Sequence, residues 1–245
     1  CSETRWLLNR RDIKWREAAK FHRRWKYRTP PALNLPANSV FLCAMFAHTE
    51  ILPFFPTLIW SHQIEAAAAA RMNGGIRAKL EALIAASPDK DHTGMWQTEH
   101  DLHTLPELQE LTSYFMGATQ GVLEFLETES QEVEITGCWA NISPSGTSHR
   151  SHMHANNFLS AVYYVSVPPG GDKITFHDPR AQIHVVAPAV KKLNGYNCEY
   201  VNVEVQEGML ILFPAWLVHS VPGNEGDALR MSVSFNINFA NFTDR

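Results

Sequence analysis

Short apolar runs dominate the second half of the chain, from Glu132 onward. Many are rich in β-branched and aromatic residues, several alternate with polar positions, and Gly, Pro and Asn separate them, which is the pattern of strands and turns. The expected strands are Val133–Ser143, Phe158–Val167, Lys173–His177, Tyr200–Val205, Met209–Phe213 and Leu229–Phe239. Because no helical pattern lies between them, the sequence predicts antiparallel pairing in a sandwich or barrel of about eight strands.

Helical patterns precede these strands. The stretch 57–87 is rich in alanine and other helix formers, and Gly74-Gly75 is expected to break it into two helices. Another helix is expected to begin near Pro106 and to run to about Glu127. The predicted fold class is mainly β with N-terminal helices, in one domain over 45–245 with a helical part (57–128) and a β core (132–240).

The beginning of the chain differs in charge from the rest. Residues 1–30 hold ten Lys and Arg against three Asp and Glu, whereas residues 31–245 hold eleven against twenty-two. The acidic body argues against a protein that follows nucleic-acid phosphates. We expect residues 1–44 to be a basic extension outside the folded domain, which would begin near Met45.

No segment predicts a membrane span or an export signal. The apolar stretch 40–60 is interrupted by His48, Glu50, Pro53 and Pro56, and it lies too deep in the chain for a signal peptide. The expectation is a cytoplasmic protein without a membrane partner.

Histidine is the residue type that could carry metal chemistry here. The four cysteines are scattered and form no C-x-x-C pair, which excludes a disulfide scaffold and cysteine-based zinc or redox motifs. Twelve histidines are present.

The densest histidine cluster is SHRSHMH at 148–154. On a strand, His152 and His154 would point to one side and Met153 to the other, so both imidazoles could bind one ion. His219, expected at the start of a strand after a buried apolar run, is the best candidate for a third ligand. A core histidine bonded to a backbone carbonyl is the alternative interpretation of His219.

A pair of polar residues farther along the chain than His219 suggests an anion site. Arg230 and Ser232 share a strand face and offer a forked cation and a hydroxyl, which suit a carboxylate. If the strand of Arg230 pairs beside the strand of His219, a short diacid could reach from the arginine to the metal.

The β half then resembles a known family, the iron(II)/2-oxoglutarate-dependent dioxygenases. The stretches that carry the resemblance are WANISPSGTSHRSHMHANNFLSAVYYV, GGDKITFHDPR, EGMLILFPAWLVHSVPGN and RMSVSFNI. Within this family the chain resembles a bacterial and phage branch, in which a segment like Phe54–Trp60 (FFPTLIW) stands near the start. The resemblance implies a double-stranded β-helix, the jelly-roll core shared with cupins.

The resemblance also raises the question of the third iron ligand. Most of the superfamily binds iron through His-x-Asp/Glu and a distal histidine. Here the carboxylate position is His154 if His152 is the first ligand, or Asn156 if His154 is first. A site of His152, His154 and His219 is the first choice, Asp178 is the alternative third ligand, and a site with two protein ligands stays open.

The resemblance implies a reaction as well. The cofactors would be Fe(II), 2-oxoglutarate and dioxygen (O2), with Arg230 and Ser232 binding the far carboxylate of 2-oxoglutarate. Tyr164 and Asn141 are further candidate contacts, whereas His149 and His177 are expected to be surface or supporting residues. Oxidative decarboxylation to succinate and carbon dioxide would accompany hydroxylation of an unactivated C–H bond.

Two other function classes fit part of the pattern. A cupin-like metal protein, acting as an isomerase, sensor or scaffold, explains the histidines but not the spacing of Arg230 and Ser232. A descendant that has lost catalysis and serves as a binding scaffold is the third interpretation. The sequence specifies neither the substrate, small molecule or peptide, nor the oligomeric state.

Overall fold

The computed structural model describes residues 51, 54–87, 94–129, 132–180 and 185–240. The chain divides into two compact units, Cys1–Thr57 and Leu58–Arg245, and the elements below belong to the second. The predicted extension over 1–44 and the predicted domain start at Met45 lie outside the described residues. No helix in the described ranges has the length and apolarity that crossing a membrane requires.

The first long helix is α3 (Ala66–Ala85), which begins with the alanine run. The Glu65 carboxylate caps it by accepting a hydrogen bond from the backbone N–H of Ala68 at 3.0 Å. The predicted break at Gly74-Gly75 is wrong, because the helix runs through both glycines.

Packing explains why α3 tolerates two glycines. Each costs about 1 kcal/mol relative to alanine inside a helix. The same helix buries Met72, Ile76 and Leu80 in the core, with Ile76 and Leu80 fully covered. Burying one such side chain contributes about 1.5–3 kcal/mol, so the core contacts outweigh the weak local preference.

A short strand replaces the start of the helix predicted over 57–87. Strand β1 (Trp60–Gln63) pairs antiparallel with β8 (Met209–Pro214), and Trp60 lies opposite Leu212. Four residues are too few to show a strand period in the sequence, and the pairing partner is distant along the chain.

The second long helix agrees with its prediction. Two 3₁₀ turns, η1 (Leu102–Thr104) and η2 (Pro106–Leu108), lead into α4 (Gln109–Phe125). Proline stands at the first position of η2, where its missing N–H costs nothing.

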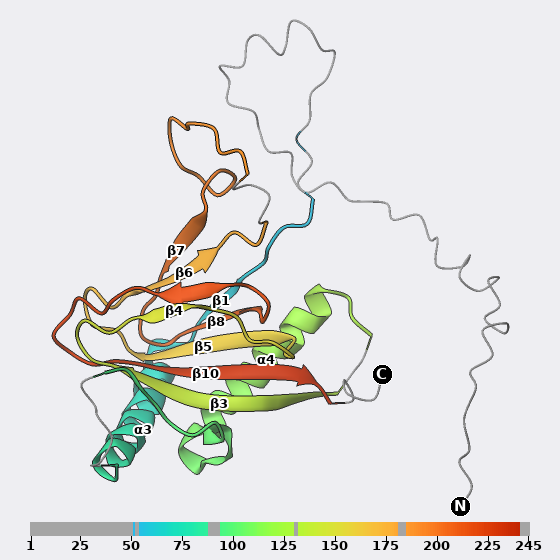
Figure 1. Cartoon of the computed structure of the whole chain (residues 1–245). Coiled ribbons are helices and arrows are strands. Elements are labelled where there is room, and N and C mark those ends of the chain that lie inside the picture. The colour runs from blue at the N-terminus through green and yellow to red at the C-terminus, as the bar shows by residue number, and fades with distance from the viewer. Residues whose placement is uncertain (1–50, 52–53, 88–93, 130–131, 181–184, 241–245) are drawn as a thin grey trace, which may run out of the picture. The chain divides into compact units, whose positions relative to one another are not determined.

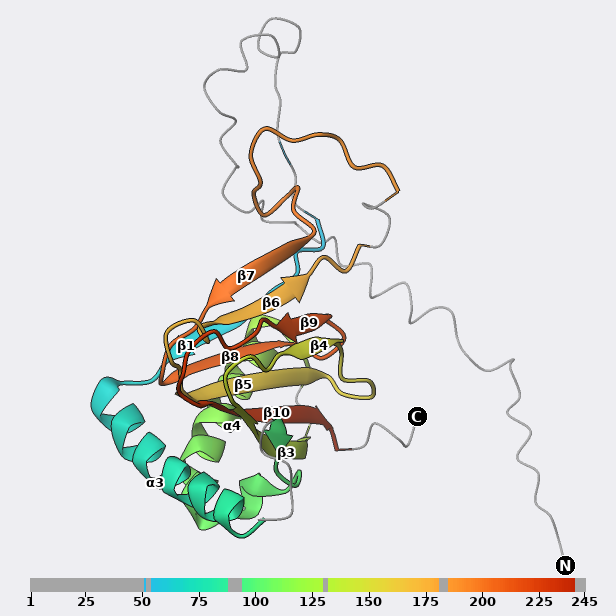
Figure 2. The same cartoon turned by 60° about the vertical axis from the view of Figure 1, so that its left-hand side comes forward.

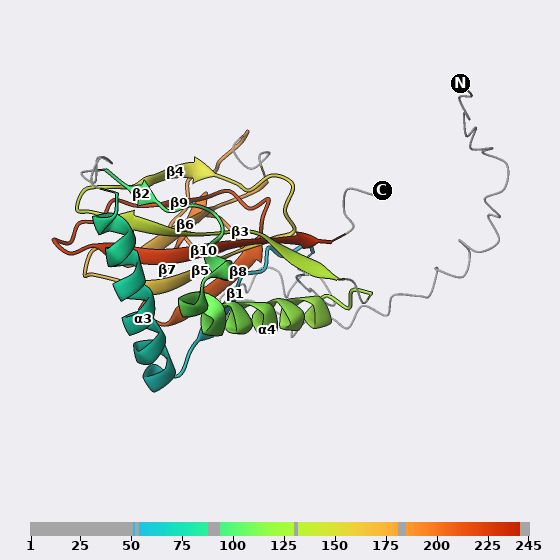
Figure 3. The ribbon, with the colours of Figure 1, turned by 90° about the horizontal axis from the view of Figure 1, so that it is seen from below.

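The described part of the chain has ten strands in two sheets. These are two more than the approximate number expected, because short strands add to the predicted ones. The six-stranded sheet has the order β1, β8, β5 (Leu159–Ser166), β10 (Arg230–Phe239), β3 (Val133–Ser143) and β2 (Trp96–Gln97). The four-stranded sheet has the order β4 (His149–His152), β9 (His219–Val221), β6 (Lys173–His177) and β7 (Tyr200–Glu204). Every pairing between these strands is antiparallel, as predicted. Figure 1 labels most of these strands, Figure 2 shows the four-stranded sheet lying over the six-stranded one, and Figure 3 also labels β2 and β9.

Strand β10 divides its side chains between two layers, because successive residues of a strand point to opposite faces. Met231, Val233, Phe235 and Ile237 belong to a core that also contains apolar residues of α3 and α4. Both helices lie on that side of the six-stranded sheet (Figure 3). Residues 230, 232, 234 and 236 face the other way, toward the four-stranded sheet.

A second core lies on the opposite face of the six-stranded sheet. It contains side chains from both sheets and from the connection before β9: Tyr164, Ile174, Phe176, Val205, Ile211, Phe213 and Leu217. These apolar contacts hold the two sheets together next to the polar face of β10.

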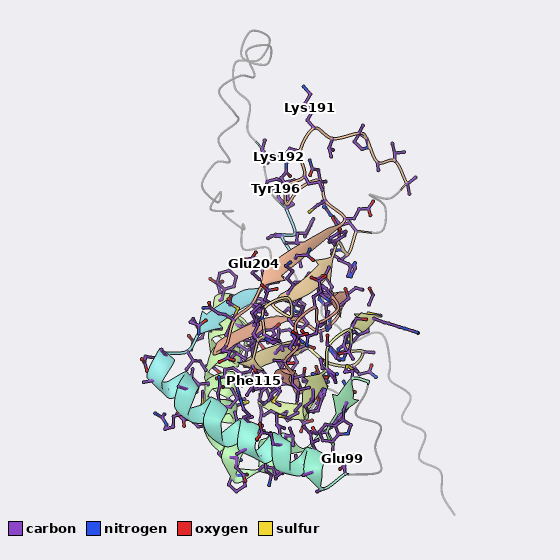
Figure 4. All side chains as sticks on the ribbon, turned by 90° about the vertical axis from the view of Figure 1, so that its left-hand side faces the viewer. Glu99, Phe115, Lys191, Lys192, Tyr196 and Glu204 are labelled. Carbon is purple, nitrogen blue, oxygen red and sulfur yellow. The ribbon has the colours of Figure 1, made fainter. Side chains whose placement is uncertain are left out.

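The connection between β6 and β7 extends beyond the sheets. Its described part includes Lys191, Lys192 and Tyr196, which lie on a loop away from the two sheets (Figure 4). Tyr196 is 69% exposed, so this loop adds little to either core.

The contact between Phe115 of α4 and Phe235 of β10 predicts how strongly the helical layer stabilises the fold. Their rings stack with centroids 4.3 Å apart, both side chains are fully buried, and Phe115 lies in the layer of side chains between helices and strands (Figure 4). We expect Phe115→Ala to lower the free energy of unfolding by about 3–5 kcal/mol. Phe125→Ala, at the exposed end of the same helix, is the matched control and should cost less than about 1.5 kcal/mol. Equal losses in urea titrations of the two variants would contradict this account.

Candidate active site

A cavity lies between the two sheets, on the polar face of β10. We call it the inner cavity. Its lining combines imidazoles, hydroxyls, one guanidinium and several apolar side chains: Gln97, Trp139, Asn141, His149, His152, His154, Ser160, Ala161, Val162, Tyr164, Ile174, Phe213, His219, Val221, Arg230, Ser232 and Ser234. Polar groups converging in an apolar enclosure are typical of a binding or catalytic site.

Three of these histidines form a potential metal site. One ring nitrogen from each of His152, His154 and His219 lies within 4.8 Å of the others. The ring centroids of His152 and His219 are 4.3 Å apart, and that of His154 lies 5.1 Å and 5.2 Å from them. The structure thus brings together the three residues chosen from the sequence, while their role as ligands stays a prediction.

The local geometry of His154 differs from the prediction. Strand β4 ends at His152, so His154 is not placed by strand alternation. Instead, the backbone N–H of His154 donates a hydrogen bond to the carbonyl of Ala215 at 2.9 Å, which fixes this residue against the turn before β9. Met153, between the two histidines, is 56% exposed and points away, as predicted.

Backbone carbonyls orient two of the imidazoles. His152 Nδ1 lies 2.8 Å from the Arg150 carbonyl, and His219 Nδ1 lies 2.9 Å from the Leu217 carbonyl. A carbonyl can only accept, so each Nδ1 carries the proton and each Nε2 presents a lone pair. Histidine ligands of metals in proteins are held in this way.

The site favours neutral imidazoles. Burial lowers the pKa of His154 and His219 to about 4, and the nearby His152 lowers both further. His219 is 3% exposed, and protonating it would place a charge in the protein interior. At neutral pH these rings are therefore in the form that binds a metal.

Arg230 lies in the same cavity on the other sheet. Its side chain is 3% exposed, and its Nε finds no hydrogen-bond partner. Its guanidinium carbon lies 5.3 Å from the centre of the Tyr164 ring, and burial lowers the pKa of Arg230. Within the described ranges no carboxylate forms an ion pair with it.

Register places the other anion-site candidates beside Arg230. On β10, Ser232 lies opposite Tyr164 of β5 and opposite Asn141 of β3. The Tyr164 hydroxyl is buried without a partner, and burial raises the pKa of Tyr164 to about 12, so it stays a donor. Asn141 differs, because its amide donates to Ser234 Oγ at 2.9 Å and accepts from Gln97 Nε2 at 2.7 Å.

One supposition about the strands is wrong. The strand of Arg230 does not pair beside that of His219, since β10 and β9 belong to different sheets. Arg230 and the histidines approach each other across the sandwich. A diacid that reached from Arg230 to the histidines would therefore bridge the two sheets, and would not lie along one sheet as the sequence suggested.

Two other sequence candidates lie outside the inner cavity. The Asp178 carboxylate forms an ion pair with Arg180 and is absent from both the cavity lining and the histidine cluster. His177 Nε2 lies 2.9 Å from Ser220 Oγ and 3.2 Å from Ser151 Oγ.

Sequence reasoning missed His149, which lines the inner cavity with its Nε2 buried and unpartnered. The register explains why. His152 lies opposite His219, but His149 lies opposite Val221, so β4 has one extra residue between the two pairs. This bulge lets residues three apart face the same cavity, whereas a regular strand would turn them to opposite sides. No sequence signal marks the bulge.

A wider cavity opens beyond the histidines. We call it the outer cavity. Its volume is about 500 Å³, and its lining residues are Gln97, His100, Thr136, Gly137, Trp139, His152, His154, Asn156, Asn157 and Asn236. His152 and His154 belong to both cavities. A metal held by these rings would therefore face a space large enough for a small molecule.

A family model confirms the resemblance predicted from the sequence. Residues 137–236 match the model described as "Putative 2OG-Fe(II) oxygenase". The matched region contains the three histidines and Arg230, and the predicted cofactors, iron(II) and 2-oxoglutarate, are those named by the family. A comparison with curated proteins finds no match.

Solved structures share the fold. The epimerase SnoN from nogalamycin biosynthesis, which is described as α-ketoglutarate-dependent, has a TM-score of 0.54 at 15% identity over 75% of this chain and 77% of its own. A prolyl-4-hydroxylase from Pseudomonas putida gives 0.52 at 14% identity, covering 75% and 93%. HygX from Streptomyces hygroscopicus, solved with nickel and 2-oxoglutarate, gives 0.55 at 10% identity, covering 85% and 89%. These likenesses confirm the predicted double-stranded β-helix fold.

The lowered pKa values predict how acid affects the metal-free protein. In the folded chain the pKa of His149, His154 and His219 is about 4, against 6.5 for an ordinary histidine. Between these values the unfolded chain binds more protons, so stability falls as pH decreases from about 6.5 toward 4. We expect the melting temperature of the chelator-treated protein to drop between pH 7 and pH 5, and to drop less in His149→Phe. A melting temperature independent of pH would contradict the buried, neutral state of these rings.

The histidine cluster predicts a variant that loses metal. We expect His219→Ala and His154→Ala to lose measurable Zn(II) and Fe(II) binding in anaerobic calorimetry, because two imidazoles alone leave too few ligands. His62→Ala, at an exposed histidine of β1, should bind metal like the wild type. Circular dichroism checks that the variants fold, and full metal affinity in both folded cluster variants would contradict the assignment.

Proposed function

We propose that this chain is an iron(II)- and 2-oxoglutarate-dependent dioxygenase that hydroxylates an unactivated C–H bond. The observation that carries the proposal is the buried guanidinium of Arg230, which forms no ion pair with a described carboxylate and lies in the cavity that holds the three-histidine cluster. The family match over 137–236 supports it.

The charge balance of the inner cavity supports a dianionic ligand. Isolating a charged group from water costs several kcal/mol unless a counter-charge compensates. A divalent metal on neutral imidazoles would add two positive charges to that of Arg230. A dicarboxylate such as 2-oxoglutarate offers two negative charges, one end for the metal and the other for Arg230.

The residues present fit both groups. His152, His154 and His219 would hold the metal through nitrogen, and the Arg230 guanidinium would bind the far carboxylate, assisted by the hydroxyls of Ser232 and Tyr164. When bound, iron and 2-oxoglutarate supply the oxidising chemistry, with succinate and carbon dioxide as products. The protein orients both ligands, and apolar walls such as Phe213 and Ile174 exclude water from them.

A metal-only, cupin-like function accounts for less of the cavity. It uses the histidine cluster but leaves Arg230 Nε and the Tyr164 hydroxyl buried without partners. Since nearly all buried polar groups in native proteins are satisfied, these two atoms favour a site that holds an anion.

The outer cavity favours a substrate whose reacting part is uncharged. Among the described residues that line it, amides, a threonine, histidines and Trp139 occur, but no Asp, Glu, Lys or Arg. Such a wall pairs with hydroxyls and amides and offers no counter-charge to an ion. The acidic body adds a general disadvantage for anionic molecules.

The test is stepwise loading of the purified protein. Fe(II) and 2-oxoglutarate, added without oxygen, should give a visible charge-transfer band, and admission of O2 should release succinate even without substrate. Arg230→Gln should keep Fe(II) but weaken 2-oxoglutarate by about tenfold to a hundredfold, because a hydrogen-bonded ion pair is lost.

The control is Arg71→Gln, which removes an exposed arginine paired with Glu110 on the helical side. It should behave like the wild type in both measurements. Absence of the band and of succinate in a protein that binds Fe(II) would reject the oxygenase in favour of a metal-only protein. Loss of Fe(II) in folded Arg230→Gln would contradict the role given to Arg230.

A further inference from the structure

We infer that His149 is a further cosubstrate-binding residue: its Nε2–H donates a hydrogen bond to the carboxylate of 2-oxoglutarate that Arg230 also binds. The inference rests on the proposed function, since it takes 2-oxoglutarate as the ligand of the inner cavity. It adds a histidine from the four-stranded sheet to an anion site otherwise built on the six-stranded sheet.

The first support is position. His149 begins β4, and the bulge before His152 turns both rings into the inner cavity. The two centroids are 5.9 Å apart, against 4.3 Å between His152 and His219. His149 is therefore outside the cluster of metal-competent nitrogens, which contains the other three histidines.

The second support is an unmet hydrogen bond. Three buried polar atoms without partners line this one cavity: His149 Nε2, Tyr164 Oη and Arg230 Nε. Each leaves a desolvation cost that a protein of this kind rarely retains in its functional state. A single carboxylate offers two oxygens and about four acceptor positions, enough for three donors.

The third support is the chemistry of the cavity wall. Among the described residues that line the inner cavity there is a cation, Arg230, but no Asp or Glu. A neutral His149 ring can carry its proton on Nε2 and donate a hydrogen bond to an anion that Arg230 also binds.

The direction toward Arg230 follows from the register. His149 lies opposite Val221, two residues beyond His219 on β9, so it is displaced along the sheet from the metal ligands. Arg230 lines the same cavity and acts electrostatically on His149. We therefore assign His149 to the carboxylate that does not chelate the metal.

The test measures cosubstrate binding to the Zn(II)-loaded protein by calorimetry, so it does not depend on turnover. We expect His149→Phe, which keeps an aromatic ring without a donor, to bind 2-oxoglutarate about tenfold or more weakly, and to keep Zn(II) affinity. His149→Gln retains an N–H near the position of Nε2 and should recover most of the loss. His177→Phe, a histidine outside the cavity lining, is the matched control and should change nothing.

A second ligand tests which end of the cosubstrate His149 contacts. 2-Oxovalerate has the same chain length but lacks the far carboxylate, so its affinity should be equal in the wild type and in His149→Phe. An equal loss for both ligands, unchanged 2-oxoglutarate binding, or loss of Zn(II) in the folded variant would each overturn the inference. A wild-type protein that binds Zn(II) but no 2-oxoglutarate would instead reject the proposed function itself.

Discussion

A guanidinium group buried between two sheets needs a counter-charge, because a protein interior cannot solvate an ion as water does. Arg230 is in this position, and the described side chains around it are imidazoles, hydroxyls, amides and apolar groups. The cation lies on the strand with the longest pairings among the described elements, since β10 pairs along most of its length with β3 on one side and β5 on the other. The paired strands hold Arg230 in this buried position, and the proposed dianionic ligand would supply the counter-charge that the described side chains around it lack.

The wall of the inner cavity opposite Arg230 consists largely of histidines. They come from β4, the segment after it and the start of β9, and backbone carbonyls hold two of them with Nε2 directed to the same place. If these imidazoles hold a divalent metal, as proposed, their neutral nitrogens would leave the metal its full charge. The metal and the buried arginine would then both attract a dianion.

Much of the fold could be predicted because local patterns determine it. Strands β3, β6 and β10 match their predicted limits to within a residue, since β-branched and aromatic runs and clear turn residues mark them. What failed depended on distant contacts. The glycine pair in α3 is held in a helix by its buried neighbours, and β1 exists only through its pairing with β8.

The same distinction applies to the site. Residue type and spacing were enough to select His152, His154, His219, Arg230 and Ser232 as candidates. Their arrangement was not predictable, because the partition of β9 and β10 between two sheets is a property of topology. His149 was missed for a related reason: one extra residue in β4 reverses the direction that strand alternation would assign to it.

The alternation along β10 has a consequence for how such a protein can change over evolutionary time. Its odd-numbered side chains, Met231 to Ile237, pack in the core that includes the helices, and its even-numbered ones, Arg230 to Asn236, line the two cavities. Substitutions on one face leave the other face's neighbours in place. Over evolutionary time, the cavity-lining positions could therefore change and alter specificity, while the packed positions keep the fold stable. Change and stability would then depend on alternate residues of one strand.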